Sequence, residues 1–544
     1  MFRRIAFRPV DAVVRHLAVT LGVTCVTAWF SYAYFHNDEY FQVIELTRAK
    51  LGDVDPRLLP WEHAQRIRPW LQPFLYWLVA RALGAVGVRD IFELAFAFRL
   101  LTGLANVGAL ALFLRTTLPW MTTDDEKRAH TRVVTLLGFL PYLFVRTSSE
   151  SGSMAALTAG FALLLAGAAP GVGGRVWSVP ALARTGRPLG VGLLFGLAFE
   201  LRFQTAILAL ALLAWARVVG KGSLRGLGKV ALGGGLALAL GALVDRWGYG
   251  AWTFPAWTYF EANILEGAAG LFGSDPPLAY LWLLPANVFF PVVLALLALA
   301  VLAWIRCPRH PLTWATLPFF VVHNLIAHKE ERFLFPIAVL STALVTMALG
   351  PSFARSPRGL GAVTERLAAW GWARRRAWPG RALAAASFAG MTLLAFVPLG
   401  WHHNVRFTRF VHETFGDELH ATALPEVDLN LPAFHPRIYD VDKADPAEVA
   451  RRIEAGTARA WLIADRPALR TGTSLDEHAT LVYSELPVWR DPVLAERALR
   501  LVERYNASAP SPLRRLRFRS LYRLPRDAGE ARTAPDGRPH DRAE

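Results

Sequence analysis

The chain has 544 residues, of which 53% are hydrophobic and 19% charged, and its formal net charge is +16. Its mean hydropathy is +0.30. So much apolar surface argues against a soluble globular protein of this length and indicates an integral membrane protein. The positive charge would suggest nucleic-acid binding if it were evenly spread, but it gathers in short segments between apolar runs, which argues against a nucleic-acid partner.

Eleven apolar stretches have about the length that a membrane span needs, since a hydrocarbon core of ~30 Å requires roughly 20 helical residues. They are residues 16–35, 72–88, 93–114, 132–146, 154–171, 191–216, 230–245, 279–305, 312–327, 335–352 and 381–400. The fourth and fifth are short enough to form a re-entrant pair instead. The predicted fold class is therefore an all-α polytopic membrane protein with about eleven transmembrane helices.

Arginine and lysine gather before residue 16, in 217–229 and in 355–381. By the positive-inside bias these segments and the N-terminus are cytoplasmic. The segments then predicted to lie outside are 36–71, 246–278, 328–334 and everything after residue 401. Arginine is much commoner than lysine, and alanine, glycine and leucine are abundant, which is typical of GC-rich bacterial genomes. We therefore expect a bacterial inner-membrane protein with an extracytoplasmic site.

The pattern changes after the last apolar stretch. RIYDVD and ARAWLIAD have the composition of strands, and the segment between them has that of a helix opened by Asp445-Pro446. We predict a membrane domain over 1–402, a small α/β extracytoplasmic domain over 403–525, and a tail over 526–544. The tail lacks apolar periodicity, so we expect it to be disordered.

A polar segment, HNDEYFQVIE, follows the first apolar stretch. If Asn37 caps a helix, Asp38 and Glu39 lie in its first turn, where the helix dipole favours anions. One interpretation is a well-capped helix at the membrane surface. The other is a carboxylate base held at headgroup depth. The continuation, LPWEHAQRIRPW, adds Glu62 and Arg68 beside tryptophans, a combination suited to an anionic headgroup.

A second polar segment, NLIAHKEERFLFP, separates two later apolar runs and contains His328, Lys329 and Arg332. These cations form either a hairpin tip whose side chains snorkel to water, or a clamp for a phosphate at headgroup level. Both interpretations fit the pattern.

Two further segments place polar groups among apolar ones. Residues 244–277 are rich in tryptophan, tyrosine and phenylalanine, as in an interfacial aromatic belt, yet aromatic faces also stack on sugars, and Asp245 and Asn263 are able to bind hydroxyls. FELRFQT puts Arg202 inside an apolar run, which indicates a functional residue unless Arg202 pairs with Glu200. FVRTSSES likewise brings an arginine and several hydroxyls into an apolar stretch.

Four of these segments resemble glycosyltransferase family 22, the GT-C mannosyltransferases of GPI-anchor and N-glycan assembly. HNDEYFQVIE resembles the family's H-P-D-E-x-F-Q signature, and PWEHAQRIRPWLQP its T-W-E…I-R-S segment. HKEERFLFP resembles its H-K-E-x-R-F-x-x-P motif, and VDRWGYGAWTFPAWTYFEANI its D-x-x-x-Y-G-x-W loop. Asn37 departs from the usual proline, and Trp257-Thr258-Tyr259 from an Asn-Phe pair. The resemblance covers 36–336 and leaves out the C-terminal domain.

The resemblance implies a hexosyltransferase, expected to be a mannosyltransferase, that uses a polyprenyl-phosphate sugar and a glycan, lipid or protein acceptor. The transfer inverts the sugar and occurs on the non-cytoplasmic face. Inversion needs one base for the acceptor proton, and the phosphate leaving group needs neutralisation of its charge. Asp38 is the predicted base and Glu39 the orienting carboxylate, although the two roles are exchangeable.

The remaining predicted residues fall into two groups. The donor phosphate is assigned to His328, Lys329, Arg332 and Arg68. The acceptor and sugar are assigned to Glu62, Asp245, Tyr249, Trp252, Asn263 and Arg202. No metal motif is present, so we expect neither metal nor cofactor. The main alternative is a transporter or flippase for lipid-linked sugars, which should show internal repeats and broken helices; the sequence shows no convincing repeat.

Overall fold

The computed structural model divides the chain into two compact units. The first contains residues 1–32 and 38–399, and the second contains 33–37 and 400–544. The residues that the structure describes are 9–32, 34–54, 56–168, 179–183, 186–268, 270, 273–287, 290–353, 360–396, 404–415, 419–427, 439–465, 469, 471–486, 490–508 and 518–525. The predicted disordered tail lies outside them.

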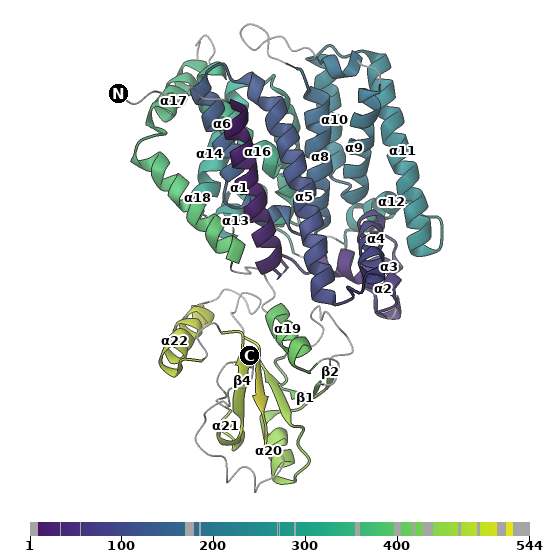
Figure 1. Ribbon diagram of the computed structural model, residues 1–544, viewed down its shortest axis with the longest axis vertical. Helices are drawn as coiled ribbons and strands as arrows, with labels where there is room; N and C mark the ends of the chain where they lie inside the picture. The colour runs from purple at the N-terminus through teal and green to yellow at the C-terminus, as the bar shows by residue number, and fades with distance from the viewer. Residues whose placement is uncertain are drawn as a thin grey trace. The chain divides into compact units, whose positions relative to one another are not determined.

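The first unit is helical (Figure 1). Its longer helices are α1 (Pro9–Phe30), α4 (Leu71–Ala85), α5 (Ile91–Thr117), α6 (Asp124–Leu136), α8 (Ser149–Leu165), α9 (Arg187–Leu201), α10 (Thr205–Val218), α11 (Leu224–Tyr249), α14 (Phe290–Arg306), α15 (Pro311–Leu325), α16 (Ala338–Leu349), α17 (Leu360–Arg374) and α18 (Trp378–Phe396). Its shorter helices and turns are η1 (Tyr40–Ile44), α2 (Glu45–Leu51), η2 (Pro56–Leu58), α3 (Trp61–Ala64), η3 (Leu118–Trp120), α7 (Leu140–Phe144), η5 (Pro180–Ala183), α12 (Pro255–Phe260), η6 (Glu261–Leu265), α13 (Tyr280–Asn287), η8 (Glu331–Ile337) and η9 (Pro351–Phe353).

Four helical stretches in the described part of the chain are long and apolar enough to cross a membrane. They are Ala12–Phe30, Ile91–Trp120, Leu224–Tyr249 and Glu331–Leu349. Three shorter apolar helices are Thr205–Val218, Val292–Arg306 and Gly380–Phe396. The predicted class, a helical membrane protein with a small C-terminal sheet, is confirmed, whereas the number of eleven spans stays a prediction.

Several predicted spans are not single helices, and two of them show the reason. The stretch 191–216 is divided between α9 and α10, because the backbone at Arg202 is extended (φ −152°, ψ 109°). The stretch 132–146 contains the end of α6 and all of α7. The two are separated near Gly138, where an added Cβ would lie 1.9 Å from the carbonyl oxygen of Ser387. The helices are thus interrupted at the polar Arg202 and at the crowded Gly138, although the apolar composition of both stretches predicted continuous helices.

Helix α9 packs closely beside α11 (Figure 1). At Gly192 a Cβ would lie only 2.0 Å from the carbonyl oxygen of Val230 on α11, so the close approach requires glycine. This contact fixes the axis of α9, and with it the position of Arg202 just beyond the helix end.

The second unit is a five-stranded sheet with helices (Figure 1). Its elements are α19 (Asn404–Phe415), β1 (Leu419–Ala423), β2 (Tyr439–Lys443), α20 (Pro446–Glu454), β3 (Trp461–Ala464), α21 (Leu475–His478), β4 (Thr480–Ser484), α22 (Pro492–Ser508) and β5 (Ser520–Arg523). The strand order is β2-β1-β3-β5-β4. Strand β1 is parallel to β2 and β3, and β5 is antiparallel to β3 and β4.

The segments predicted as strand, helix and strand correspond to β2, α20 and β3. Asp445 caps α20 by accepting a hydrogen bond from the backbone N–H of Glu448 at 2.8 Å, and Pro446 occupies its first turn. The core of the unit includes Leu419, Leu462 and Leu521, all buried. The predicted domain boundaries and the extracytoplasmic position of this unit stay predictions.

Candidate active site

Asp38 begins the helical segment that continues through the π-helical turn η1 into α2. π-Helical turns are rare and are frequent at functional sites. The predicted cap is wrong, because the buried side-chain oxygen of Asn37 has no hydrogen-bond partner among the described residues. Capping therefore does not account for the polar residues here.

The side chains of Gln42 and Arg332 contact Asp38. The Gln42 amide donates to its Oδ2 at 2.5 Å, and the guanidinium of Arg332 donates to the same oxygen and forms an ion pair with it. Arg332 is almost fully buried, whereas 23% of the Asp38 side chain is exposed. The snorkelling interpretation is therefore wrong for Arg332. Arg332 thus places a buried positive charge against the Asp38 carboxylate.

A first arm of polar contacts leads from Asp38 to Arg68. Gln42 also donates to Oε1 of Glu62 at 3.3 Å, and Glu62 pairs with Nη2 of Arg68 at 2.5 Å. Burial acts to lower the pKa of Arg68, but Glu62, Tyr259 and Asp38 together outweigh it and hold the pKa above its usual range. The buried Nε of Arg68 has no hydrogen-bond partner among the described residues, so this arginine keeps a donor for a ligand.

A second arm leads from Asp38 to Arg202. Nη1 of Arg332 lies 3.4 Å from Oε1 of Glu150, and the same oxygen lies 3.1 Å from Nη2 of Arg202. Glu150 is on the first turn of α8 and is buried. Two arginines from distant parts of the chain thus share one carboxylate.

Arg332 has a third carboxylate neighbour in Glu330, with which it also forms an ion pair. Glu330 in turn accepts a hydrogen bond from Nε2 of His328 at 2.8 Å. This hydrogen bond raises the pKa of His328 above its ordinary value. Glu330 is therefore the link between the predicted His328 and Arg332.

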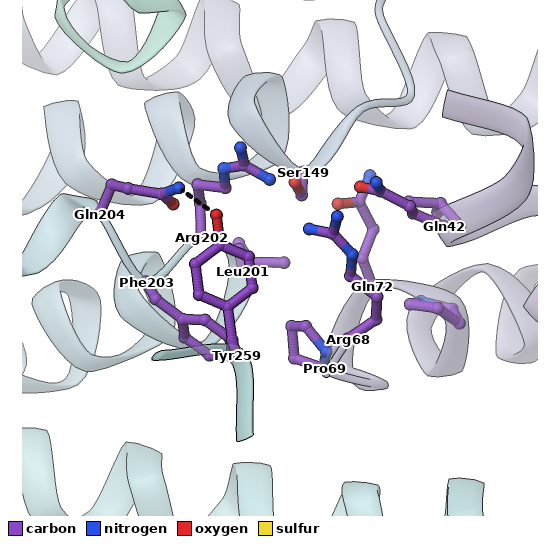
Figure 2. Close-up of a pocket in the computed structure, with 12 residues that line it drawn as sticks. Gln42, Arg68, Pro69, Gln72, Ser149, Leu201, Arg202, Phe203, Gln204 and Tyr259 are labelled. Carbon is purple, nitrogen blue, oxygen red and sulfur yellow. Dashed lines mark hydrogen bonds between the residues drawn. The ribbon is translucent and has the colours of Figure 1, made fainter. Parts of the chain in front are cut away.

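Both arms end at one cavity (Figure 2). It contains about 390 Å³ of empty space, including its open mouth. Figure 2 shows the guanidinium groups of Arg68 and Arg202 directed toward the space between them, with Ser149 between them in this view and the Tyr259 ring at one side. Gln204 donates to the Tyr259 hydroxyl at 3.0 Å. The lining residues are Gln42, Val43, Arg68, Pro69, Gln72, Pro73, Ser149, Leu201, Arg202, Phe203, Gln204 and Tyr259.

Sequence comparison identifies the family of the chain. The model of the Alg9-like mannosyltransferase family matches residues 16–417. The chain belongs to this family. The resemblance inferred from the four motifs is thereby confirmed.

Two relatives and one solved structure illustrate how far the likeness extends. A GPI mannosyltransferase 3 of Gibberella zeae is 25% identical over 62% of this chain and 59% of its own length. A probable Dol-P-Man:Man(7)GlcNAc(2)-PP-Dol alpha-1,6-mannosyltransferase of Schizosaccharomyces pombe is 33% identical over 18% of each chain. The chain therefore spans less than two thirds of these relatives. The apo crystal structure of ArnT from Cupriavidus metallidurans has a TM-score of 0.46 at 13% identity, covering 87% of this chain and 96% of that one.

Glu39, the other carboxylate of the Alg9-like HNDE motif, faces a different environment from Asp38. It is buried and accepts hydrogen bonds from the backbone N–H and the hydroxyl of Thr147, at 3.0 and 3.2 Å. The neighbouring Arg146 donates from Nη2 to the carbonyl oxygen of Ser31 at 2.8 Å. Glu39 thus ties its helix to the start of α8, whereas Asp38 is the more accessible carboxylate.

Three residues predicted to bind acceptor or donor contact the main chain, and their binding roles stay predictions. Asp245 accepts from the backbone N–H of Trp70 at 2.8 Å, and the Tyr249 hydroxyl donates to the carbonyl oxygen of Arg68 at 2.6 Å. Lys329 donates from Nζ to the carbonyl oxygen of Asp275 at 3.2 Å. In the Alg9-like site, Asp245 and Tyr249 therefore support the segment that carries Arg68.

The last two predicted sugar-binding residues lie outside the cavity lining. Asn263 donates to the carbonyl oxygen of Tyr259 at 3.1 Å within its own helix. Trp252 is exposed, and the Arg246 guanidinium lies 5.6 Å from the centre of its ring. Their assignment to acceptor or sugar stays a prediction.

Glu150 was not predicted as a site residue, and Glu200, the alternative partner predicted for Arg202, is wrong. Arg202 pairs with Glu150, whereas Glu200 faces Gly241 on α11. Glu150 was present in FVRTSSES as an acid beside an apolar run, and a buried charge there requires an opposite partner. Its partner, Arg202, is 52 positions away in sequence and follows a different helix. Residue spacing along one helix therefore did not indicate the pair.

Proposed function

We propose that this protein transfers a mannosyl residue from a polyprenyl-phosphate sugar to a hydroxyl of a glycan, lipid or protein acceptor, with inversion. The single observation that carries the proposal is the connection of Asp38, through two arms of hydrogen bonds and ion pairs, to two arginines that face one cavity. A carboxylate base and a cationic phosphate site are the two groups that such a transfer needs.

The reaction is one displacement. The acceptor oxygen attacks C1 of the sugar while the bond from C1 to the phosphate oxygen breaks. The acceptor proton goes to the Asp38 carboxylate, and the electron pair of the broken bond stays on the polyprenyl phosphate. Arg68 and Arg202 neutralise the charge that develops there, and they do so strongly because both are largely buried.

This assignment changes the predicted phosphate clamp. Of the four cations proposed from the sequence, Arg68 lines the cavity. Arg332 stands between Asp38 and Glu150 and positions both. We infer that Arg202 takes the place of Arg332 as a phosphate ligand and that His328 acts through Glu330. Direct phosphate contacts of His328 and Lys329 stay predictions.

The positive-inside bias supports a position of the site on the non-cytoplasmic face of a bacterial inner membrane. Labelling of single cysteines tests this in a background without Cys25 and Cys307. A cysteine at the exposed position Asp53 should react with an impermeant reagent from outside, and one at the exposed Arg366 only after the membrane is opened. Reaction of both from the same side would contradict the topology.

The transporter alternative predicted internal repeats and broken helices, and the chain has a broken helix at Arg202. Here the break delivers Arg202 to the cavity and to Glu150, and the family is one of mannosyltransferases. The name of the Schizosaccharomyces pombe relative gives a lipid-phosphate mannose as donor, which supports the same donor class for this chain.

The test incubates the purified protein with radiolabelled polyprenyl-phosphate-mannose and a cell-wall extract. We expect label to move to an acceptor in the extract, and we expect Arg68→Ala and Arg202→Ala to abolish most of this transfer. Arg309→Ala is the matched control, because Arg309 is exposed and outside the cavity lining. Movement of intact labelled lipid across a bilayer without any transfer would contradict the proposal and favour the transporter.

A further inference from the structure

Helix α12 and the turn η6 form a continuous helical segment with an exposed apolar stripe. Trp257, Phe260 and Ile264 follow one another at spacings of three and four and are 55%, 42% and 52% exposed. The ring centroids of Trp257 and Phe260 are 5.9 Å apart. A water-facing helix surface is normally polar, so a stripe of this composition marks a binding surface or a membrane contact.

The opposite face of the same segment borders the cavity. Tyr259 lines it (Figure 2), and the Arg68 guanidinium lies 5.5 Å from the centre of the Tyr259 ring. Tyr259 also packs edge-on against Phe203, with ring centroids 5.6 Å apart. One helical segment therefore separates the two cavity arginines from the exposed stripe.

The charges of the segment indicate which part of a lipid fits the stripe. Glu261 and Glu266 are both exposed, and their carboxylates disfavour an anionic headgroup there. An uncharged hydrocarbon chain has no such penalty, and it gains free energy by covering aromatic surface. The cationic side of the segment suits a phosphate, and the apolar side suits the chain attached to it.

We propose that the stripe of Trp257, Phe260 and Ile264 binds the polyprenyl tail of the donor while its phosphate lies between Arg68 and Arg202. This inference rests on the proposed function. A helix with its side chains is about 10 Å across, so a geranyl tail ends near the inner face, whereas an undecaprenyl tail extends over the stripe. The site therefore selects donors by tail length.

The test compares geranyl-phosphate-mannose with undecaprenyl-phosphate-mannose in detergent solution. For Trp257→Ala with Phe260→Ala, we expect KM for the undecaprenyl donor to rise about 5- to 10-fold, as loss of part of two aromatic contacts predicts. The KM for the geranyl donor and kcat for both should stay unchanged. Trp378→Ala is the matched control, because Trp378 on α18 is 75% exposed and outside this segment; it should change neither KM.

An equal rise in KM for both donors would overturn the proposal, because it would show damage to the cavity. No change for either donor would also overturn it and leave the stripe as an interfacial anchor. Trp257→Phe, which keeps an aromatic ring, should restore most of the affinity. If the double variant does not fold, Ile264→Ala provides the same comparison at a single exposed position.

The inference and the proposed function are separable by binding alone. Undecaprenyl phosphate and geranyl phosphate, which carry no sugar, are compared by native mass spectrometry of the wild-type protein and the double variant. If the wild type transfers no sugar, the proposed function fails. The tail site is supported if undecaprenyl phosphate binds the wild type more tightly than the variant, while geranyl phosphate binds both proteins equally. It is contradicted if each of the two lipids binds the wild type and the variant equally.

Discussion

Two buried arginines of the helical unit, Arg306 and Arg332, use their guanidinium groups in different ways. Arg306 forms a two-point ion pair with Glu365, at 3.0 and 2.8 Å. Its Nη1 donates to the carbonyl oxygens of Met347, Ala348 and Gly350, which end helix α16. One positive charge is balanced by one negative charge, and the free carbonyl oxygens of a helix end are satisfied.

Arg332 instead contacts three carboxylates, those of Asp38, Glu150 and Glu330. Its buried Nη1 has no hydrogen-bond partner of acceptable geometry among the described residues, and its pair with Glu150 is shared with Arg202. Arg306 donates hydrogen bonds from all three of its guanidinium nitrogens, and one carboxylate balances its charge. Arg332 contacts three carboxylates, and one of them, Glu150, connects it to Arg202 at the cavity. This difference separates a role in stability from a role in catalysis.

The largest expected effect is on turnover, at Asp38. Asp38→Asn keeps the size of the side chain but removes the base, so kcat should fall by roughly 10²–10⁴-fold while donor binding stays nearly normal. Glycosyl transfer and binding of the lipid donor are measured on the same preparation. An active Asp38→Asn enzyme would remove Asp38 as the base.

Glu39→Gln provides the companion measurement. Because Glu39 is buried and bound to Thr147, we expect a smaller loss of kcat and a loss of thermal stability. An inactive but stably folded Glu39→Gln enzyme beside an active Asp38→Asn enzyme would assign the base to Glu39 instead.

The next effect is on stability, at Arg306. Arg306→Ala removes the Arg306 guanidinium from Glu365 and from the three carbonyl oxygens, so the free energy of unfolding should fall by about 3–5 kcal/mol, the range for a broken buried pair. Activity per folded molecule should persist. Denaturation in detergent measures the change, with the exposed Arg309→Ala as control. A stable but inactive Arg306→Ala protein would break the comparison between the two arginines.

A smaller effect is expected at Arg332 on the use of the donor. Arg332→Ala should lower kcat/KM for the lipid donor by a factor equivalent to about 1.5–3 kcal/mol, the range for hydrogen bonds to charged groups. Arg332→Lys should recover only part of this loss because the planar fork that reaches several carboxylates is absent. Unchanged steady-state kinetics in Arg332→Ala would place Arg332 with Arg306 as a structural residue.

The smallest effect concerns a buried carboxylate in the C-terminal unit. Burial raises the pKa of Glu485 to about 7, although the backbone N–H groups of Phe407 and Arg519 donate to it and act in the opposite direction. Because the pKa is higher in the folded state, the stability contribution is fully present below the ordinary pKa of 4.5 and is lost as pH rises through about 7.

We therefore expect the C-terminal unit to lose on the order of 1–3 kcal/mol of stability between pH 4.5 and pH 8. A fluorophore on a cysteine at the exposed position Glu503 of the full-length protein reports its unfolding in urea. In Glu485→Gln the stability of the C-terminal unit should depend less on pH. The activity of the helical unit is measured as the control. If the stability of Glu485→Gln still depends on pH over this range, another titrating group is responsible.

Much of the site was predictable from the sequence because its chemistry is confined to short polar segments in an apolar chain. An ionisable residue is costly in a membrane, so HNDEY, HKEER and FELRFQT indicated Asp38, Arg332 and Arg202 without any structure. The helical class followed equally from apolar runs of membrane length. The small C-terminal strands followed from their composition and from the Asp445-Pro446 helix start.

Only the tertiary structure decided how these charges are paired. Asp38 and Arg332 are 294 positions apart, yet they form an ion pair, and Glu150 joins Arg332 to Arg202. The spacing of residues along one helix determines which of them share a face. It does not determine which face of another helix packs against that face. The packing of α8 and α9 and the break after α9 set those contacts. The sequence by itself thus determined that buried charges are present, and packing across distant segments determined that Arg202, rather than Arg332, faces the cavity.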